Sequence, residues 1–233
     1  MKEDLTKPIN NNNNNIEEEA ENEEESTTIN YFEMFQSLGK RAAPSINLAT
    51  LGLISLLAFL IRIFSVIRYE SVIHEFDPWF NYRVTQFLTS EGAYAFWNWY
   101  DPESWYPLGR IIGGTTYPGL MFTSALIHWL CNTLLFPIDI RNICVFLAPV
   151  FAALTAISSY YFVKEVTGRS DGGLLSALFI AIVPGYISRS VAGSYDNEAV
   201  AIFALLATFY FFLRAVNTVR NIFYFFKIRF VFY

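Results

Sequence analysis

Two short acidic motifs in this sequence are of a kind that can bind a divalent metal ion. They are the pairs Glu75 and Asp77, and Asp196 and Glu198, each with one residue between the carboxylates. In an extended or turn backbone, two carboxylates at this spacing can turn toward one centre, whereas within a helix they would diverge by roughly 200°. Carboxylate oxygens are the ligands that Mg²⁺ and Mn²⁺ prefer. The spacing therefore favours a hard-metal site if both motifs lie in loops.

Arg189 precedes the second motif by seven residues. A cation there can hydrogen-bond the carboxylates and fix their orientation, or it can extend toward lipid headgroups. The first motif also has a structural explanation, because Asp77 before Pro78 suits a helix start with Asp as the N-cap and Pro as the first helical residue. Both a binding role and a structural role are therefore considered for these residues.

Long apolar stretches flank both motifs and predict an all-α, polytopic membrane protein. About 20 apolar residues suffice to cross the hydrocarbon core of a bilayer. The first such stretch lies too deep in the chain, behind a long acidic segment, to be a cleavable signal peptide, so we expect a signal-anchor helix. The predicted transmembrane helices are 46–67, 143–163, 172–187 and 199–213.

Basic residues predict the orientation of these helices. Cytoplasmic flanks of membrane helices are enriched in Lys and Arg. Three basic groups lie next to apolar stretches, at 40–41, 164–169 and 214–229. All three can face the cytoplasm only if two crossings separate the first group from the second. Three apolar stretches lie between those groups, so one of them is expected not to cross.

The stretch 117–136 is the one that we expect not to cross. It is interrupted by polar residues such as His128 and has a proline at each end. We interpret it as an interfacial or re-entrant helix within a loop over 68–142 on the non-cytoplasmic side, which is the lumen or the exterior. The alternative is that it spans the membrane and Arg141 marks a cytoplasmic turn. In the first interpretation the loop and the turn over 188–198 both face the lumen, and each carries one acidic motif.

The amino-terminal part of the chain differs in composition from the rest. Residues 1–30 carry nine acidic and two basic residues and a run of six asparagines. A segment of this kind cannot bury enough apolar surface to offset its ordering entropy. We therefore predict a disordered, Asn/Glu-rich cytoplasmic tail over 1–45, with an acidic docking tail as the functional alternative.

Three segments together resemble the STT3 family, the catalytic subunit of the dolichyl-diphosphooligosaccharide–protein glycosyltransferase (oligosaccharyltransferase). They are HEFDPWFNYR, ESWYPLGRIIGGTTYPGLM and SRSVAGSYDNEAVAIF, and the resemblance covers about residues 45–217. It implies the N-terminal part of a C-type glycosyltransferase (GT-C) transmembrane domain in the endoplasmic reticulum membrane, with its active face lumenal. The implied reaction is protein N-glycosylation, in which a preassembled oligosaccharide passes from dolichyl diphosphate to Asn in N-x-Ser/Thr sequons.

The resemblance also implies roles for individual residues. Asp77 matches an acidic residue that binds the divalent metal and contacts the acceptor, so it is a catalytic and acceptor-binding candidate. Asp196 and Glu198 match a second metal-binding motif, and Arg189 matches an arginine that is important for catalysis beside it. Glu75 is a weaker candidate for the metal site. The implied cofactor is Mn²⁺ or Mg²⁺.

The implied partners are a dolichyl-diphosphate-linked oligosaccharide, an acceptor polypeptide with an N-x-Ser/Thr sequon, other oligosaccharyltransferase subunits and membrane lipid, without nucleic acid. The family's later helices and soluble domain would follow Tyr233. We therefore expect an N-terminal fragment that is inactive alone, with an aberrant cytoplasmic end over 214–233. One alternative is a non-catalytic membrane subunit or decoy fragment. A metal-ion transporter is a less favoured alternative, and it would place acidic residues inside the helices.

Overall fold

The structure is a computed structural model that describes residues 43–231, with side chains as far as Arg220. The predicted disordered tail over 1–45 lies outside the described residues except for its last three positions, which are helical. The chain divides into two units, Met1–Leu48 and Ala49–Tyr233, and the second unit carries both acidic motifs.

Three helices in the described part of the chain are long and apolar enough to cross a membrane. They are Ala43–Tyr69, α5 (Ile140–Thr167), and the segment Asn197–Arg220 of α8 (Asn197–Val231). A turn at Ile63 interrupts the first of them, so that its last part forms the short helix α2 (Phe64–Tyr69). The predicted helices 46–67, 143–163 and 199–213 fall within these bounds.

The fourth predicted crossing, 172–187, consists of two helices. They are α6 (Ser170–Ile182) and α7 (Pro184–Ile187), with Val183 extended between them. The break has a local cause, because a proline disfavours helical backbone at the residue before it. The 13 residues of α6 span roughly 20 Å, which is less than the hydrocarbon core of about 30 Å. A crossing over 172–187 therefore stays a prediction.

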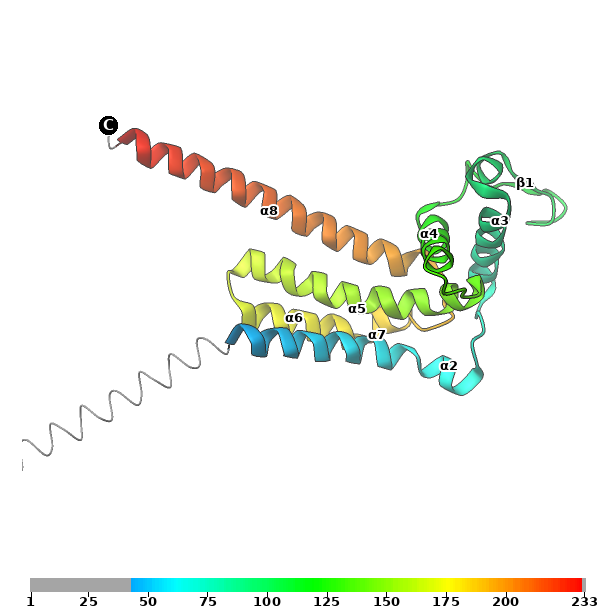
Figure 1. Ribbon diagram of the computed structural model, residues 1–233, viewed down its shortest axis with the longest axis horizontal. Coiled ribbons are helices and arrows are strands. Elements are labelled where there is room, and N and C mark those ends of the chain that lie inside the picture. Colours follow the sequence, from blue (N-terminus) through cyan, green and yellow to red (C-terminus); the bar gives the residue numbers. More distant parts are fainter. Residues whose placement is uncertain (1–42, 232–233) are drawn as a thin grey trace, which may run out of the picture. The chain divides into compact units, whose positions relative to one another are not determined.

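Small residues allow the first helix, α5 and α6 to approach closely. These helices run side by side in Figure 1, and α8 packs along α5. A Cβ atom at Gly173 of α6 would collide with the carbonyl oxygen and ring of Tyr160 on α5. Close approach over small residues is how helices associate in a bilayer, where burial of apolar surface gives little driving force. The buried small residues of this bundle are Ala58, Ala156, Ala177 and Ala181.

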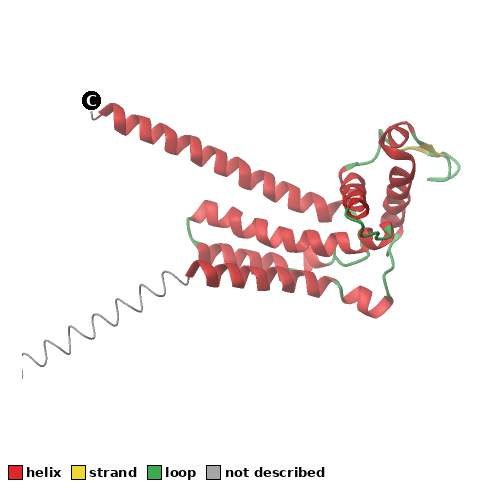
Figure 2. Ribbon diagram, in the orientation of Figure 1, coloured by secondary structure: helices red, strands yellow, loops and turns green. Residues whose placement is uncertain are grey.

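The predicted loop 68–142 is mostly helical. It contains α3 (Phe76–Asn98), a two-residue antiparallel pair of β1 (Tyr100–Asp101) and β2 (Arg110–Ile111), and α4 (Gly119–Thr133). Figure 2 shows that this pair is the one strand element in the described part of the chain, so the predicted all-α class is confirmed. With 15 residues, α4 is not among the helices of membrane-spanning length. The prediction that 117–136 does not cross is consistent with this length and stays a prediction.

A single core joins α3, α4, α5 and the turn before α8. Apolar side chains from all four parts are buried against one another, which fixes the positions of the segments that carry the two motifs. The most deeply buried members are Ile73, Val84, Phe96, Ile112, Met121, Cys144, Val145, Ala192 and Tyr195.

Candidate active site

The turn that carries the second acidic motif is bonded to the segment that precedes the first. The backbone N–H of Ala192 donates to the carbonyl oxygen of Arg62 at 2.9 Å, and that of Gly193 donates to Val145 at 3.1 Å. In return, the N–H of His74 donates to the carbonyl oxygen of Gly193 at 3.0 Å. These three hydrogen bonds bring the two motifs to the same end of the helical bundle.

Gly193 makes this close approach sterically possible. Its φ of +93° lies in the region that residues with a side chain rarely adopt. A Cβ atom at this position would also collide with the carbonyl oxygen of Val72 and the ring of His74. A glycine is therefore required where the turn crosses the extended segment 70–75.

Asp77 and Asp196 line one cavity of about 200 Å³. Asp77 lies in the first turn of α3, and Asp196 directly precedes α8. Polar side chains of Asn81, Arg110 and Asn197 contribute to the same lining. The structure thus brings together one carboxylate from each of the two predicted motifs, although 118 residues separate them in the sequence.

Asn81 connects the two halves of this cavity. Its side-chain Nδ2 donates to the carbonyl oxygen of Tyr195 at 3.1 Å and lies 3.5 Å from Oδ1 of Asp196. Asn81 belongs to neither acidic motif and was not among the predicted site residues. It follows Asp77 by four residues, and residues at this spacing share one face of a helix, which is the signal that could have identified it.

Tyr195 holds the residue before Asp196 in the core. Its hydroxyl lies 2.9 Å from the hydroxyl of Thr85 on α3 and 2.7 Å from that of Ser124 on α4. Burial raises the pKa of the Tyr195 hydroxyl well above its usual value. The group therefore stays neutral and links three segments by hydrogen bonds, which is a positioning function.

The carboxylate of Glu198 has a polar partner for only one of its two oxygens among the described residues. Its Oε1 lies 3.9 Å from Nη1 of Arg189, and its Oε2 is buried without a hydrogen-bond partner among the described residues. The carboxylate of Asp196 also repels it. A buried unpaired carboxylate oxygen beside a second carboxylate is stabilised when a cation lies nearby or when one of the two groups is protonated.

The carboxylate oxygens of the two motifs are of the chemical type that binds a hard divalent cation. Asp77 and Asp196 contribute carboxylates to one cavity, and Oε2 of Glu198 lacks a partner near Asp196. No three His, Cys, Asp or Glu side chains within residues 43–220 are already grouped as a metal cluster. The side chains present therefore supply suitable ligands that are not preassembled around one point.

The structure corrects two assumptions about the first motif. Asp77 is not the N-cap of α3, because Glu75 occupies that position with a φ of +67° and makes no capping hydrogen bond through its side chain. Nor do both motifs lie wholly in loops, since Asp77 and Glu198 are each in a first helical turn. Glu75 is exposed and is not among the residues that line the cavity.

A buried arginine holds the other side of the second motif. Nε of Arg62 donates to Oγ of Ser190 at 2.7 Å, and its Nη1 donates to the carbonyl oxygens of Ala58 and Ala181 at 2.8 and 2.9 Å. The guanidinium also lies 4.8 Å from the ring centre of Tyr186. An ionisable residue in an apolar helix is costly unless it has such partners. Its isolation within the stretch 46–67 was the sequence signal for this contact.

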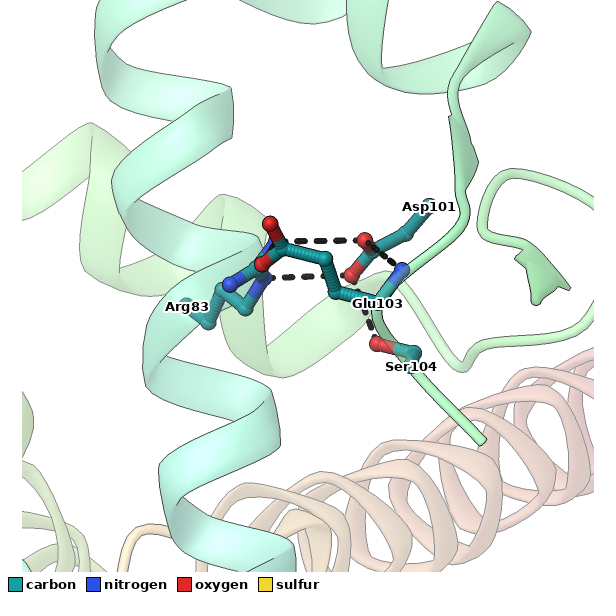
Figure 3. A network of polar contacts seen from close by, with 4 residues as sticks. All are labelled: Arg83, Asp101, Glu103 and Ser104. Atoms are coloured by element: carbon teal, nitrogen blue, oxygen red, sulfur yellow. Dashed lines mark hydrogen bonds and ion pairs between the residues drawn. The ribbon is translucent and has the colours of Figure 1, made fainter. Parts of the chain in front are cut away.

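A second polar network attaches the hairpin formed by β1 and β2 to α3. Figure 3 shows Arg83 facing Asp101, with Nε and Nη2 each 3.1 Å from one carboxylate oxygen. Burial alone would raise the pKa of the Asp101 carboxyl, but hydrogen bonds from Ser104, the Glu103 N–H and Arg83 outweigh it and lower the pKa. The network fixes the chain next to Trp105, which lines the cavity.

Comparison with known proteins agrees with the resemblance to the STT3 family along most of the chain. Residues 46–233 match the family described as oligosaccharyl transferase STT3, N-terminal. The chain is 59% identical over 192 residues to the dolichyl-diphosphooligosaccharide–protein glycosyltransferase subunit STT3B of Arabidopsis thaliana, covering 82% of this chain and 26% of that protein. It is 60% identical over 168 residues to subunit STT3 of Dictyostelium discoideum, covering 72% and 23%.

A solved structure shows that the fold is shared with an archaeal protein. The oligosaccharyltransferase AglB from Archaeoglobus fulgidus, in complex with an inhibitory peptide and a dolichol-phosphate, superposes with a TM-score of 0.64 at 21% identity. The match covers 76% of this chain and 20% of AglB. The chain spans about a quarter of the length of the curated relatives that it matches. It belongs to the STT3 family and corresponds to the N-terminal part of these oligosaccharyltransferase subunits.

Proposed function

We propose that the protein is the catalytic subunit of an oligosaccharyltransferase in the endoplasmic reticulum membrane. It would transfer a preassembled oligosaccharide from dolichyl diphosphate to the side-chain amide of Asn in an N-x-Ser/Thr sequon of an acceptor polypeptide. The observation that carries this proposal is the cavity shared by Asp77 and Asp196, at one end of a bundle of apolar helices. Family membership supports the choice of reaction.

The cavity suits a reaction between an amide and a lipid-linked diphosphate. In the transfer, the amide nitrogen forms a bond to the first carbon of the sugar, and the bond from that carbon to the phosphate oxygen breaks. The diphosphate leaves with the electron pair, and the amide nitrogen loses one proton. A reaction of this kind needs a base on the acceptor side and positive charge on the diphosphate side.

Asp77 is the residue that we assign to the acceptor. Its exposed carboxylate at the start of α3 can accept hydrogen bonds from the amide N–H groups. Those hydrogen bonds would favour a twisted amide, in which the nitrogen lone pair is less delocalised, and the same carboxylate can accept the released proton. Lining the cavity places Asp77 beside the second motif, which is the arrangement this role requires.

Asp77, Asp196 and Glu198 would hold Mn²⁺ or Mg²⁺. When bound, the ion would neutralise negative charge that develops on the leaving diphosphate. Arg189 would orient Glu198 and reduce the repulsion within the second motif, which is supported by its 3.9 Å ion pair with that residue. Glu75 remains the weaker candidate ligand because its side chain is exposed outside the cavity lining.

The proposed function is tested by glycosylation of an N-x-Thr peptide with native membranes that contain the protein at the length at which the cell makes it, together with its partner subunits. Wild-type protein is expected to glycosylate the peptide in the presence of Mn²⁺, and Asp77→Asn is expected to lower kcat by at least about a hundredfold. Asp171→Asn, at the exposed start of α6, is the matched control and should retain wild-type kcat. Full activity of Asp77→Asn would refute the assigned role of Asp77.

A further inference from the structure

Arg110 is a cation that faces the carboxylate cavity from the hairpin. It lies at the start of β2 and lines the cavity together with Asp77 and Asp196. Arg110 was not among the predicted site residues, and neither acidic motif contains it. Its position is therefore a structural observation that the proposed roles of Asp77, Arg189, Asp196 and Glu198 do not use.

The guanidinium of Arg110 is held rigidly on one side. Nε donates to Oγ1 of Thr115 at 2.7 Å, and Nη2 donates to the carbonyl oxygen of the same residue at 2.6 Å. The guanidinium carbon lies 4.4 Å from the ring centre of Trp105 and 5.0 Å from that of Phe80. Stacking against two aromatic rings fixes its plane and leaves an edge free.

Much of the hydrogen-bonding capacity of this guanidinium is unused. A guanidinium has five N–H donors, and two nitrogens of Arg110 bond to Thr115. Among the described residues, Arg110 is not in an ion pair with any carboxylate within 4.0 Å. A fixed cation that has free donors and faces a polar cavity is suited to an anion, because its planar fork matches the oxygens of a phosphate group.

We propose that Arg110 binds the diphosphate group of the lipid-linked donor. This inference rests on the proposed function and names the residue that would recognise the donor in the same cavity. The acceptor amide is neutral, and the two carboxylates would repel an anionic acceptor, so the diphosphate is the substrate group that requires a cation here. Arg110 needs little reorganisation to bind it, since Thr115 and the aromatic rings already fix the guanidinium.

Binding of two probes to the full-length protein in nanodiscs, measured by calorimetry with Mn²⁺ present, tests this inference. Inorganic pyrophosphate tests recognition of the diphosphate alone, and farnesyl diphosphate tests recognition of a lipid-linked diphosphate. Arg110→Gln is expected to weaken the binding of farnesyl diphosphate on the order of tenfold, as for the loss of one charge-assisted contact. Arg169→Gln removes an exposed arginine at the start of α6 and should leave the binding unchanged.

A second variant guards against misfolding of the hairpin. Arg110→Lys keeps the charge but replaces the fork by a point charge, so we expect a smaller loss, roughly threefold. If thermal unfolding shows that Arg110→Gln is not folded, Arg110→Lys decides the question. Weaker binding of both probes identifies the diphosphate as the recognised group. Weaker binding of farnesyl diphosphate alone identifies the lipid-linked form as the recognised ligand.

The inference is overturned if the folded variants bind both probes within twofold of wild type, or if wild-type protein binds neither probe. Failure of the proposed function gives a different result. In that case wild-type protein glycosylates no peptide, while its diphosphate binding still depends on Arg110. Peptide glycosylation together with diphosphate binding that is independent of Arg110 refutes only the inference about Arg110.

Discussion

Asn81 donates through Nδ2 to the carbonyl oxygen of Tyr195 and lies 3.5 Å from the carboxylate of Asp196. This side chain links the helix that begins at Asp77 to the turn that carries the second motif. The link matters because it adds a side-chain contact next to the two carboxylates of the cavity, whose segments are also joined by backbone hydrogen bonds and by the core.

Replacement of Asn81 by Ala should weaken the connection between the motifs. The carbonyl oxygen of Tyr195 would lose its donor, at a cost of about 1–3 kcal/mol in the free energy of unfolding. Asp196 would be less well oriented, so its affinity for Mn²⁺ should fall roughly tenfold. Asn98→Ala is the control, since Asn98 lies beyond the kink of α3 at Gly92, is exposed and donates to the carbonyl oxygen of Tyr94. Equal effects of the two substitutions would contradict this function of Asn81.

Replacement of Gly193 by Ala should displace the second motif. The new Cβ would collide with the carbonyl oxygen of Val72, and the backbone would be strained at its positive φ, together costing at least about 1–3 kcal/mol. Gly185→Ala is the control because a Cβ there meets no atom within 4 Å. Thermal unfolding in detergent measures both, and an unfolding temperature of Gly193→Ala equal to that of wild type would refute the steric argument.

Replacement of Arg62 by Met should loosen the turn between α7 and α8. The substitution keeps an apolar side chain of similar length but removes the hydrogen bonds to Ser190 and Ala181. Hydrogen–deuterium exchange should therefore rise in residues 188–196, and the unfolding free energy should fall by about 1–3 kcal/mol. Arg68→Met, an exposed arginine one and a half turns later, should change neither quantity. Unchanged exchange over 188–196 in Arg62→Met would count against a positioning role.

The attachment of the hairpin should depend on pH through Asp101. Its pKa is lowered in the folded protein, so the stabilisation is complete above the unfolded value of about 3.9 and is lost as the pH falls through the folded pKa. The difference in unfolding temperature between wild type and Asp101→Asn should therefore be constant from about pH 7 to pH 5 and shrink below about pH 4. Asp171→Asn, whose carboxylate is exposed, should not show this trend. A difference that stays constant down to pH 3 would contradict the prediction.

The ends of the long helices illustrate what the sequence could predict. The predicted helix 143–163 lies within α5, which continues beyond it because the polar residues after it remain helical as far as the glycine cap. That cap is Gly168, with a φ of +71°, which ends α5. The stretch 172–187 was predicted as one helix, although the backbone breaks before Pro184. Hydropathy locates apolar segments, whereas caps and prolines set where helices end.

The pairing of the two motifs was predictable, but the side chains that hold them together were not. Charge distribution and the number of crossings placed both motifs on one face, and the structure brings Asp77 and Asp196 to one cavity. Asn81 and Arg110 reach this cavity through the packing of α3 and the hairpin against the turn. The contact between Asn81 and Asp196 joins residues 115 positions apart, so the four-residue spacing from Asp77 shows that Asn81 shares its helix face but not that it reaches the second motif.

In the proposed site, Asp77 and Asp196 would hold one divalent ion between them. The most direct test is the affinity for Mn²⁺, measured by electron paramagnetic resonance on the full-length protein, for wild type, Asp77→Asn, Asp196→Asn and the double variant. If both carboxylates bind the same ion, each single substitution should lower the affinity for Mn²⁺ on the order of tenfold or more. The loss of binding free energy in the double variant should then be smaller than the sum of the two single losses. Affinities that stay within twofold of wild type, or two effects that add fully, would contradict a shared site.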